Sequence, residues 1–253
     1  MKPTIACVLR SGGRYTSEWV LRLKRGLERH ASGPHRFVCL ADVDVPDIEV
    51  LPLRECWPGW WSKIELFRPG LLTGPTIYLD LDVVVTGDVA PLFRACDRFT
   101  MVHERGKADY FNSSAMAWIG EMGHVFEAFR RDPARHMERF RRHPRIGDQA
   151  FISELLVREG RAPRTFRRVL GYDAIVSYKR DRCESGAPPR ACIVNFHGTP
   201  KPCDLKTGWV AEAIAELRLD RGGATDHLPG SSGWHPGLSV PPPSHKWPRA
   251  TLP

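Results

Sequence analysis

Apolar residues near the start of the chain occur in short continuous runs, and between the first two runs they recur every three or four positions. The run at residues 4–9 predicts a buried strand, and a glycine-bearing loop follows it. A helix is expected next, because Thr16 or Ser17 can cap it, its apolar side chains share one face, and Gly33-Pro34 ends it. Residues 36–40 predict a second strand. This order of strand, helix and strand is typical of a parallel, nucleotide-binding sheet.

The strongest strand signal lies at residues 77–85, which are apolar except at Asp80 and Asp82. Weaker patterns predict other strands at residues 48–53, 99–102, 113–118 and 193–196. Helical patterns occur at residues 61–67, 122–132, 133–143, 148–159 and 209–217. Beyond residue 221 the chain is rich in glycine, proline and serine. We therefore predict an α/β domain at residues 1–221 and a Gly/Pro-rich tail without regular structure at residues 222–253.

The length and composition are those of one ordinary globular domain with a tail, in 253 residues. No apolar run reaches the roughly twenty residues of a membrane-spanning helix, and the first residues lack the apolar core of a signal peptide. A cytoplasmic protein is therefore expected. Seven cysteines occur without a CxxC pair, and Cys7, Cys39 and Cys192 lie inside apolar runs. This usage indicates buried, reduced thiols and no thiolate zinc site.

The formal charge of +8 would attract anions such as nucleic acid, an acidic membrane surface or a phosphorylated substrate. The arginines concentrate at residues 130–145, where a helix pair with a solvated basic face explains them. No nucleic-acid-binding motif accompanies the charge. We therefore expect no nucleic-acid partner, whereas peripheral contact with a membrane is compatible with the charge.

Asp80 and Asp82 are two residues apart in a segment predicted to be extended, so their side chains should leave the same face and converge on one cation. Carboxylate oxygens suit Mg²⁺ or Mn²⁺, and such an ion can bridge the phosphates of a nucleotide. A single pair of this kind is a weak signal. At the end of an apolar strand it is stronger, because two buried charges are costly unless a cation compensates them. A structural pair of partly exposed acids is the alternative.

His197 is predicted where the last strand ends and the turn Gly198-Thr199-Pro200-Lys201-Pro202 begins. At such a place an imidazole can join a metal, and a lysine can meet phosphate. Gly198 would let the backbone approach a ligand closely, and Lys201 would supply a point charge for a diphosphate. A structural histidine is the alternative interpretation.

Four segments resemble, in order and spacing, the retaining glycosyltransferases related to glycogenin and the bacterial lipopolysaccharide galactosyltransferases. The resemblance covers roughly residues 1–217 and is carried by residues 78–85 (YLDLDVVV), 111–116 (FNSSAM), 147–149 (GDQ) and 195–202 (NFHGTPKP). It implies a GT-A fold, an α/β mixed sheet flanked by helices that binds a nucleotide sugar, usually a UDP-sugar. It also implies Mn²⁺, or Mg²⁺, held by Asp80, Asp82 and His197.

The same resemblance implies roles for single residues. Gly198 and Lys201, with Asp80, would contact the donor diphosphate, and Asn112 would face the transferred sugar. Asp148 and Gln149 would lie near its anomeric carbon. The resemblance also assigns the nucleotide to the loop that carries Arg10 and Tyr15, whereas Lys63 and Arg68 either reach the donor or belong to a helix surface. Two departures weaken any transfer of specificity: Cys203 replaces a tryptophan, and Ser114 replaces a glycine.

The resemblance favours a metal-dependent glycosyltransferase that moves a sugar, with retention, to an unknown carbohydrate or glycolipid acceptor. Two alternatives remain. Residues 80–84 (DLDVV) also fit the nucleophile motif of haloacid-dehalogenase-like phosphatases, although that motif normally opens its domain. A catalytically inactive basic module that binds sugar or nucleic acid would bind ligand without turnover.

Overall fold

The computed structural model describes residues 2–103, 111–142, 146–184, 186 and 189–219. These residues belong to one of the two units into which the chain divides, Met1–Asp220. The predicted tail at residues 222–253, and with it the domain boundary at residue 221, lies outside the described residues.

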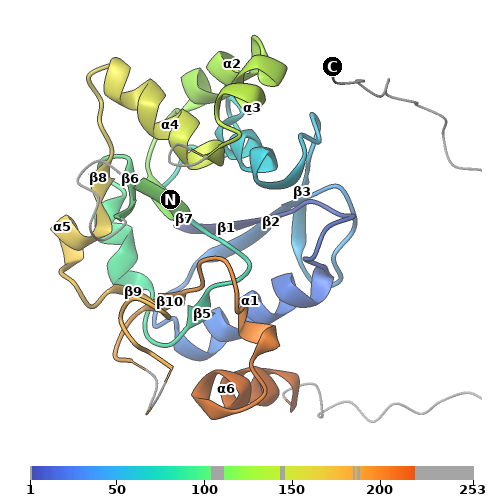
Figure 1. The fold of residues 1–253 in the computed structure, drawn as a ribbon, viewed down its shortest axis with the longest axis vertical. Helices are drawn as coiled ribbons and strands as arrows, with labels where there is room; N and C mark the ends of the chain where they lie inside the picture. Colours follow the sequence, from blue (N-terminus) through green and yellow to red (C-terminus); the bar gives the residue numbers. More distant parts are fainter. Residues whose placement is uncertain (1, 104–110, 143–145, 185, 187–188, 220–253) are drawn as a thin grey trace, which may run out of the picture. The chain divides into compact units, whose positions relative to one another are not determined.

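A seven-stranded mixed sheet forms the centre of this unit, with the strand order β3-β2-β1-β4-β7-β6-β8 (Figure 1). The first four strands in the chain run parallel: β1 (Thr4–Leu9), β2 (Arg36–Ala41), β3 (Glu49–Pro52) and β4 (Thr76–Leu79). Antiparallel to β4 lies β7 (Phe111–Trp118), followed outward by β6 (Thr100–His103) and β8 (Arg164–Thr165). The α/β fold predicted from the sequence is therefore confirmed.

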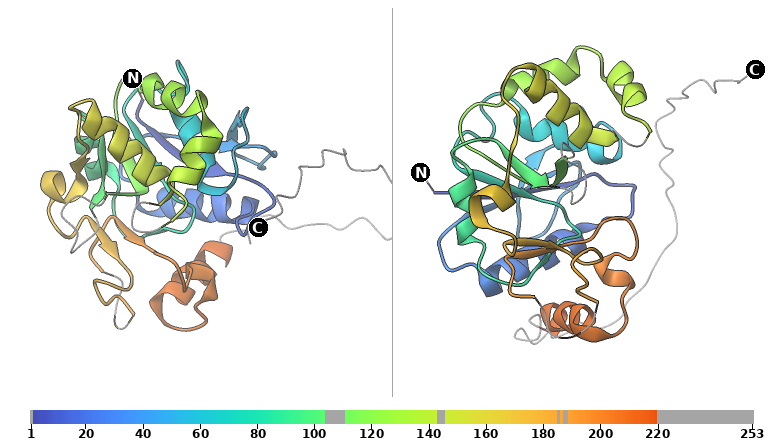
Figure 2. Two further views of the ribbon diagram at one scale, coloured as in Figure 1. Left: turned by 45° about the horizontal axis from the view of Figure 1, so that its top comes forward. Right: turned by 60° about the vertical axis from the view of Figure 1, so that its left-hand side comes forward.

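Both faces of the sheet are covered, which explains why β1 is buried at every position and apolar from Ile5 to Leu9. Ile5, Cys7 and Leu9 face α1 (Ser17–His30), and Ala6 and Val8 face the opposite side. That side is covered by elements drawn above the sheet in Figure 1: η1 (Gly59–Phe67), α2 (Gly123–Arg130), α3 (Pro133–Arg139) and α4 (Gly147–Arg158). Figure 2 shows the same two layers from other directions.

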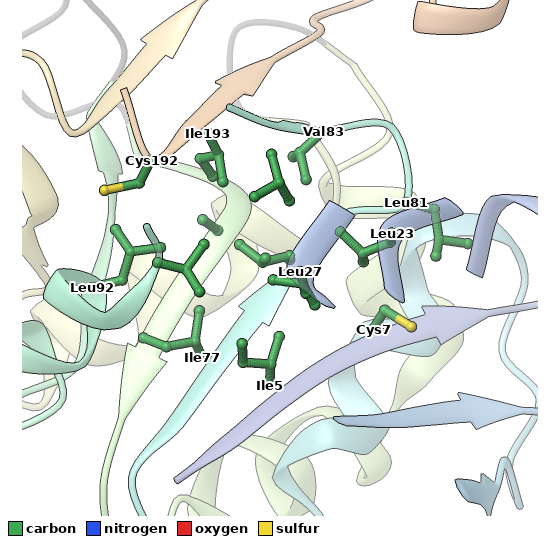
Figure 3. Close-up of a cluster of buried hydrophobic side chains, with 14 of the residues drawn as sticks. Ile5, Cys7, Leu23, Leu27, Ile77, Leu81, Val83, Leu92, Cys192 and Ile193 are labelled. Atoms are coloured by element: carbon green, nitrogen blue, oxygen red, sulfur yellow. The ribbon is translucent and has the colours of Figure 1, made fainter. Parts of the chain in front are cut away.

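A second sheet of three strands, in the order β5-β10-β9, lies beside the first. It consists of β5 (Val84–Val85), β10 (Ile193–Asn195) and β9 (Ile175–Ser177). Helix α6 (Gly208–Leu219) packs against it through Trp209, Val210 and Ile214. In Figure 3 side chains of this sheet meet those of α1 and the large sheet in one buried cluster, which joins the two sheets.

The prediction of one strand at residues 77–85 is wrong. The chain leaves the large sheet after Leu79, and the Val83 amide donates to the Asp80 carbonyl at 3.4 Å, so Asp80 and Asp82 lie in a turn. The run continues as β5 in the other sheet. A continuous apolar run cannot reveal such a change of sheet, because both strands are buried.

Other differences are small. The helix expected at residues 61–67 is a 3₁₀ helix, η1, and several short elements were not predicted. These are η2 (Ala90–Ala95), β8, α5 (Phe166–Leu170), β9 and η3 (Pro202–Asp204). All seven cysteines are free, and Cys7, Cys39 and Cys192 are buried as predicted. Among the described residues no helix is both long and apolar enough to span a membrane.

Candidate functional site

Three parallel strands end at the same edge of the large sheet, and each is followed there by a polar residue. Arg10 follows β1, Asp42 follows β2 and Asp80 follows β4. Because β7 is antiparallel to β4, its first residues, among them Asn112, reach the same edge. The Asp80 amide donates to the Ser114 carbonyl at 2.8 Å and fixes this junction. The crevice outside the carboxyl ends of parallel strands is where α/β sheets bind ligands.

A cavity of about 750 Å³ opens at this edge. With one exception, its lining includes the residues that the sequence predicted for catalysis, donor binding or metal binding: Arg10, Tyr15, Lys63, Asp80, Asp82, Asn112, Asp148, Gln149, His197, Gly198 and Lys201. The exception is Arg68, which is buried, donates to the Pro52 carbonyl at 2.8 Å and pairs with Glu65. Arg68 thus has a structural role.

Lys63 joins the acidic groups at one end of the cavity. Its Nζ lies 2.8 Å from Asp80 Oδ1, 3.2 Å from Ser113 Oγ and 3.8 Å from Asp148 Oδ2. Burial alone would lower the pKa of Lys63, but the carboxylates of Asp148 and Asp80 raise it above its ordinary value. The side chain is therefore a buried, permanently charged ammonium group.

Asp82 is the centre of a second set of contacts. Its Oδ2 accepts a hydrogen bond from the Tyr15 hydroxyl at 2.7 Å and is also bonded to the Lys201 ammonium. Burial, and then the nearby charge of Asp82, raise the pKa of Tyr15, so the phenol stays protonated and remains a donor. Lys201 Nζ also donates to the Phe196 carbonyl at 3.2 Å.

The small sheet brings Asp82 and His197 together. Strands β5 and β10 are antiparallel, with Val84 opposite Val194, so the residues before β5 face the residues after β10. Phe196 stacks on Tyr178 at 4.5 Å between ring centroids and anchors the turn that carries His197. His197 Nδ1 lies 3.5 Å from the Asn112 amide nitrogen.

Asp148 and Gln149 lie in the first turn of α4 and face the cavity. The Asp148 side chain is buried, and its Oδ2 has no hydrogen-bond partner among the described residues. Burial raises the pKa of Asp148, and Lys63 opposes that rise. Gln149 Oε1 accepts from the Ser113 amide at 3.4 Å. The N-cap position of α4 belongs to Ile146, so Asp148 is not the capping residue.

The same arrangement of strands occurs in solved glycosyltransferase structures. The glycosyltransferase GlyE of Streptococcus pneumoniae TIGR4 superposes with a TM-score of 0.59 at 15% identity, over 86% of this chain and 60% of that one. The galactosyltransferase LgtC, in complex with donor and acceptor sugar analogs, superposes with a TM-score of 0.54 at 17% identity, over 90% of this chain and 98% of that one. The chain has the GT-A fold.

An active-site mutant of LgtC gives a similar superposition, with a TM-score of 0.55 and 16% identity over 90% of this chain and 98% of that one. This chain spans about 60% of the length of the GlyE structures. No protein-family model and no curated protein matches the sequence. The GT-A fold predicted from the sequence motifs is thus confirmed by structure alone.

The cavity of this GT-A fold suits a divalent cation by charge and by donor type. Arg10 and Arg14 are paired with Asp42 and Asp204, so among the described lining residues Lys63 and Lys201 are the basic side chains that face the carboxylates of Asp80, Asp82 and Asp148. A bound diphosphate would add negative charge, which a hard cation on carboxylate oxygens offsets.

The described side chains do not already form a three-ligand metal cluster, and both Asp80 and Asp82 are bonded to lysines. A cation at Asp82 must therefore compete with Lys201.

Two residues of this region were not predicted. Asp42 does not line the cavity, but it holds the loop after β1 by accepting from the Ser11 amide at 2.7 Å and the Ser11 hydroxyl at 2.6 Å. It lies two residues beyond the strand predicted at residues 36–40, so a search for polar residues just after predicted strands could have found it. Trp60 lines the cavity, and its position depends on the packing of its neighbours, which a sequence pattern does not reveal.

Proposed function

We propose that this chain is a glycosyltransferase that moves a sugar from a nucleotide sugar, a UDP-sugar in particular, to an acceptor hydroxyl. One observation carries the proposal. A GT-A fold places two carboxylates, Asp80 and Asp82, beside two lysines in the same cavity as Asn112, Asp148 and Gln149. Charged groups of both signs beside polar amides match a ligand that has both a diphosphate and a sugar.

The nucleotide sugar is expected to lie along the edge of the sheet. Lys201 supplies charge to its diphosphate, and Gly198, whose φ is +63° and whose missing side chain leaves open space, lets the backbone approach it. Arg10 and Tyr15, in the loop after β1, line the part assigned to the nucleotide. Asn112, Asp148 and Gln149 then face the transferred sugar.

Asp80, Asp82 and His197 would hold a Mn²⁺ or Mg²⁺ ion, which would compensate the negative charge of the leaving diphosphate. We expect Asp82→Ala to abolish Mn²⁺-dependent nucleotide binding, because it removes one of the three proposed ligands of the ion. Isothermal titration with UDP, with and without Mn²⁺, checks this. Unchanged activity of the wild-type protein in excess chelator would refute the metal assignment.

The reaction is expected to retain the anomeric configuration. The bond between the anomeric carbon and the diphosphate oxygen breaks, and the diphosphate leaves with the electron pair. The acceptor oxygen bonds to the same carbon from the same face and gives its proton to a leaving-group oxygen. We expect Asp148, which is buried in the cavity lining, to stabilise positive charge on the sugar. Proton NMR of fresh product, read against the anomer of the donor, distinguishes retention from inversion.

The acceptor is proposed to be a carbohydrate or glycolipid. The LgtC structure holds a donor and an acceptor sugar analog. The net charge of +8 favours an anionic acceptor or peripheral contact with an acidic membrane, and a cytoplasmic location stays a prediction.

The deciding experiment is incubation with a panel of nucleotide sugars and Mn²⁺. Slow hydrolysis of one of them to free nucleotide supports the proposal. Binding of nucleotide without any turnover would identify an inactive binding module instead, and release of phosphate from aryl phosphates would identify a phosphatase.

A further inference from the structure

Three tryptophans lie within five residues at the start of η1, and they differ in exposure. Trp57 and Trp61 are buried, with ring centroids 4.7 Å and 5.1 Å from that of Phe129. Trp60, between them, is 49% exposed and lines the cavity. An indole left half in water forgoes part of the stabilisation that full burial would give, and the exposed part of this ring, in the lining of the cavity, is available to a ligand.

Trp60 is held against the backbone that precedes Asp148. A Cβ added to Gly147 would lie 2.9 Å from Trp60 Nε1 and 3.1 Å and 3.2 Å from the two ring carbons bonded to that nitrogen. An atom approaching the nitrogen in the plane of the ring would lie much farther from the two carbons than from the nitrogen. The three distances are similar, so Gly147 lies over the face of the five-membered ring. Gly147 also has a φ of +76°, which favours glycine for a second reason. The ring is thus fixed beside Asp148 and Gln149.

The position of Trp60 favours a sugar ring over a nucleotide base as its ligand. It lies next to the residues assigned to the reacting carbon, whereas Arg10 and Tyr15, assigned to the nucleotide, follow β1. Aromatic faces carry partial negative charge, which attracts the polarised C–H groups on one face of a pyranose. A half-exposed ring at the rim can receive a ligand that enters from solvent, as the acceptor does.

We propose that Trp60 is a stacking platform for a pyranose ring of the acceptor. The proposal rests on the proposed glycosyltransferase function, and it specifies a pyranose ring of the acceptor and the residue on which that ring stacks. Gly147 positions the platform.

The test compares Trp60→Ala and Trp60→Phe with the control Tyr172→Ala, an aromatic residue that is 55% exposed outside the cavity lining. Donor hydrolysis without acceptor, UDP affinity, and transfer to a panel of methyl glycosides of glucose, galactose, mannose and N-acetylglucosamine are measured. We expect Trp60→Ala to raise the KM for the accepted glycoside about tenfold, equivalent to about 1.4 kcal/mol of binding free energy. Donor hydrolysis and UDP affinity should fall much less than transfer, Trp60→Phe should recover part of the loss of transfer, and the control should match the wild type in all three measurements.

Different results would contradict the stacking role of Trp60 and the proposed glycosyltransferase function. Equal losses of hydrolysis and transfer in Trp60→Ala would make Trp60 structural, and a loss of UDP affinity would make it a base-stacking residue. A wild-type protein that hydrolyses a donor but uses no glycoside of the panel would overturn the pyranose platform while leaving the transferase standing. Absence of any donor hydrolysis would instead refute the proposed function.

Discussion

Lys201 contacts the Asp82 carboxylate, and the proposed function gives it a second anionic partner, the diphosphate of the donor. Lys201→Met keeps the length of the side chain and removes its charge. We expect UDP affinity to fall by roughly ten- to a hundredfold, the range of a lost charge-assisted hydrogen bond, with little change for uridine. Mn²⁺ affinity without nucleotide should rise, because Asp82 loses a competing cation.

Isothermal titration measures the affinities for UDP and for uridine, and electron paramagnetic resonance measures free Mn²⁺. Lys206→Met, at an exposed position outside the cavity lining, is the matched control. Equal losses for UDP and uridine would show that Lys201 is structural, and weaker Mn²⁺ binding would contradict competition at Asp82.

Asp42 connects the loop after β1 to the sheet and makes the stability of the fold depend on pH. Burial alone would raise the pKa of Asp42, but the Ser11 hydroxyl and amide and the Arg10 guanidinium lower it below its ordinary value. The ionised carboxylate therefore stabilises the fold above the pKa of the unfolded chain, and this contribution disappears as the pH falls through the folded pKa.

Asp42→Asn should cost about 1–2 kcal/mol of unfolding free energy near neutral pH, and the difference should shrink below about pH 4. Urea unfolding across this pH range measures it, with the exposed Asp44→Asn as control. A difference that persists undiminished in acid would show that the charge of Asp42 is not its cause.

Among the elements, the short pair β5 and β10 depends on close contact between backbones. A Cβ at Gly87, two residues after the end of β5, would lie 2.5 Å from the Ala191 carbonyl oxygen, which is backbone and cannot rotate away. Gly87→Ala should therefore destabilise the protein by about 1–3 kcal/mol. The same change at Gly33, where a Cβ meets open space, should be nearly neutral.

Urea unfolding of the two variants compares them directly. Because β5 and β10 hold Asp82 and His197, Gly87→Ala should also lower UDP affinity while the protein is still folded. Equal stability of the two variants would mean that the strands can separate at no cost.

Prediction from sequence succeeded where an element is long or ends at the edge of the sheet. The runs at residues 4–9 and 36–40 became β1 and β2, and the polar residues that follow strands converged in one cavity because parallel strands end together. The prediction failed at residues 77–85, because these residues would be equally buried in one continuous strand and in two strands of different sheets. It could not find the ion pair of Lys63 with Asp80, or the exposure of Trp60, because both depend on tertiary packing.

At the scale of the whole molecule, the described residues that line the cavity all lie in the range from Val8 to Lys201. Removal of residues 231–253 should leave the melting temperature and UDP affinity unchanged. Removal of residues 208–253 also deletes α6, whose Trp209, Val210 and Ile214 are buried in the cluster beside the small sheet, and should prevent stable folding. Thermal unfolding of both truncated chains checks this, and loss of soluble protein on the shorter deletion would assign a structural role to the tail.

The pairing of β5 with β10 has a consequence for synthesis of the chain. Asp82 and Lys201 are 119 positions apart, and among the described strands β5 pairs with β10 alone, which is made much later. A growing chain can therefore assemble the parallel strands of the large sheet long before its proposed donor site is complete. Fragments that end before residue 193 lack the strand that carries the turn with His197 and Lys201, so under the proposed function an interrupted translation product would be unable to consume nucleotide sugar.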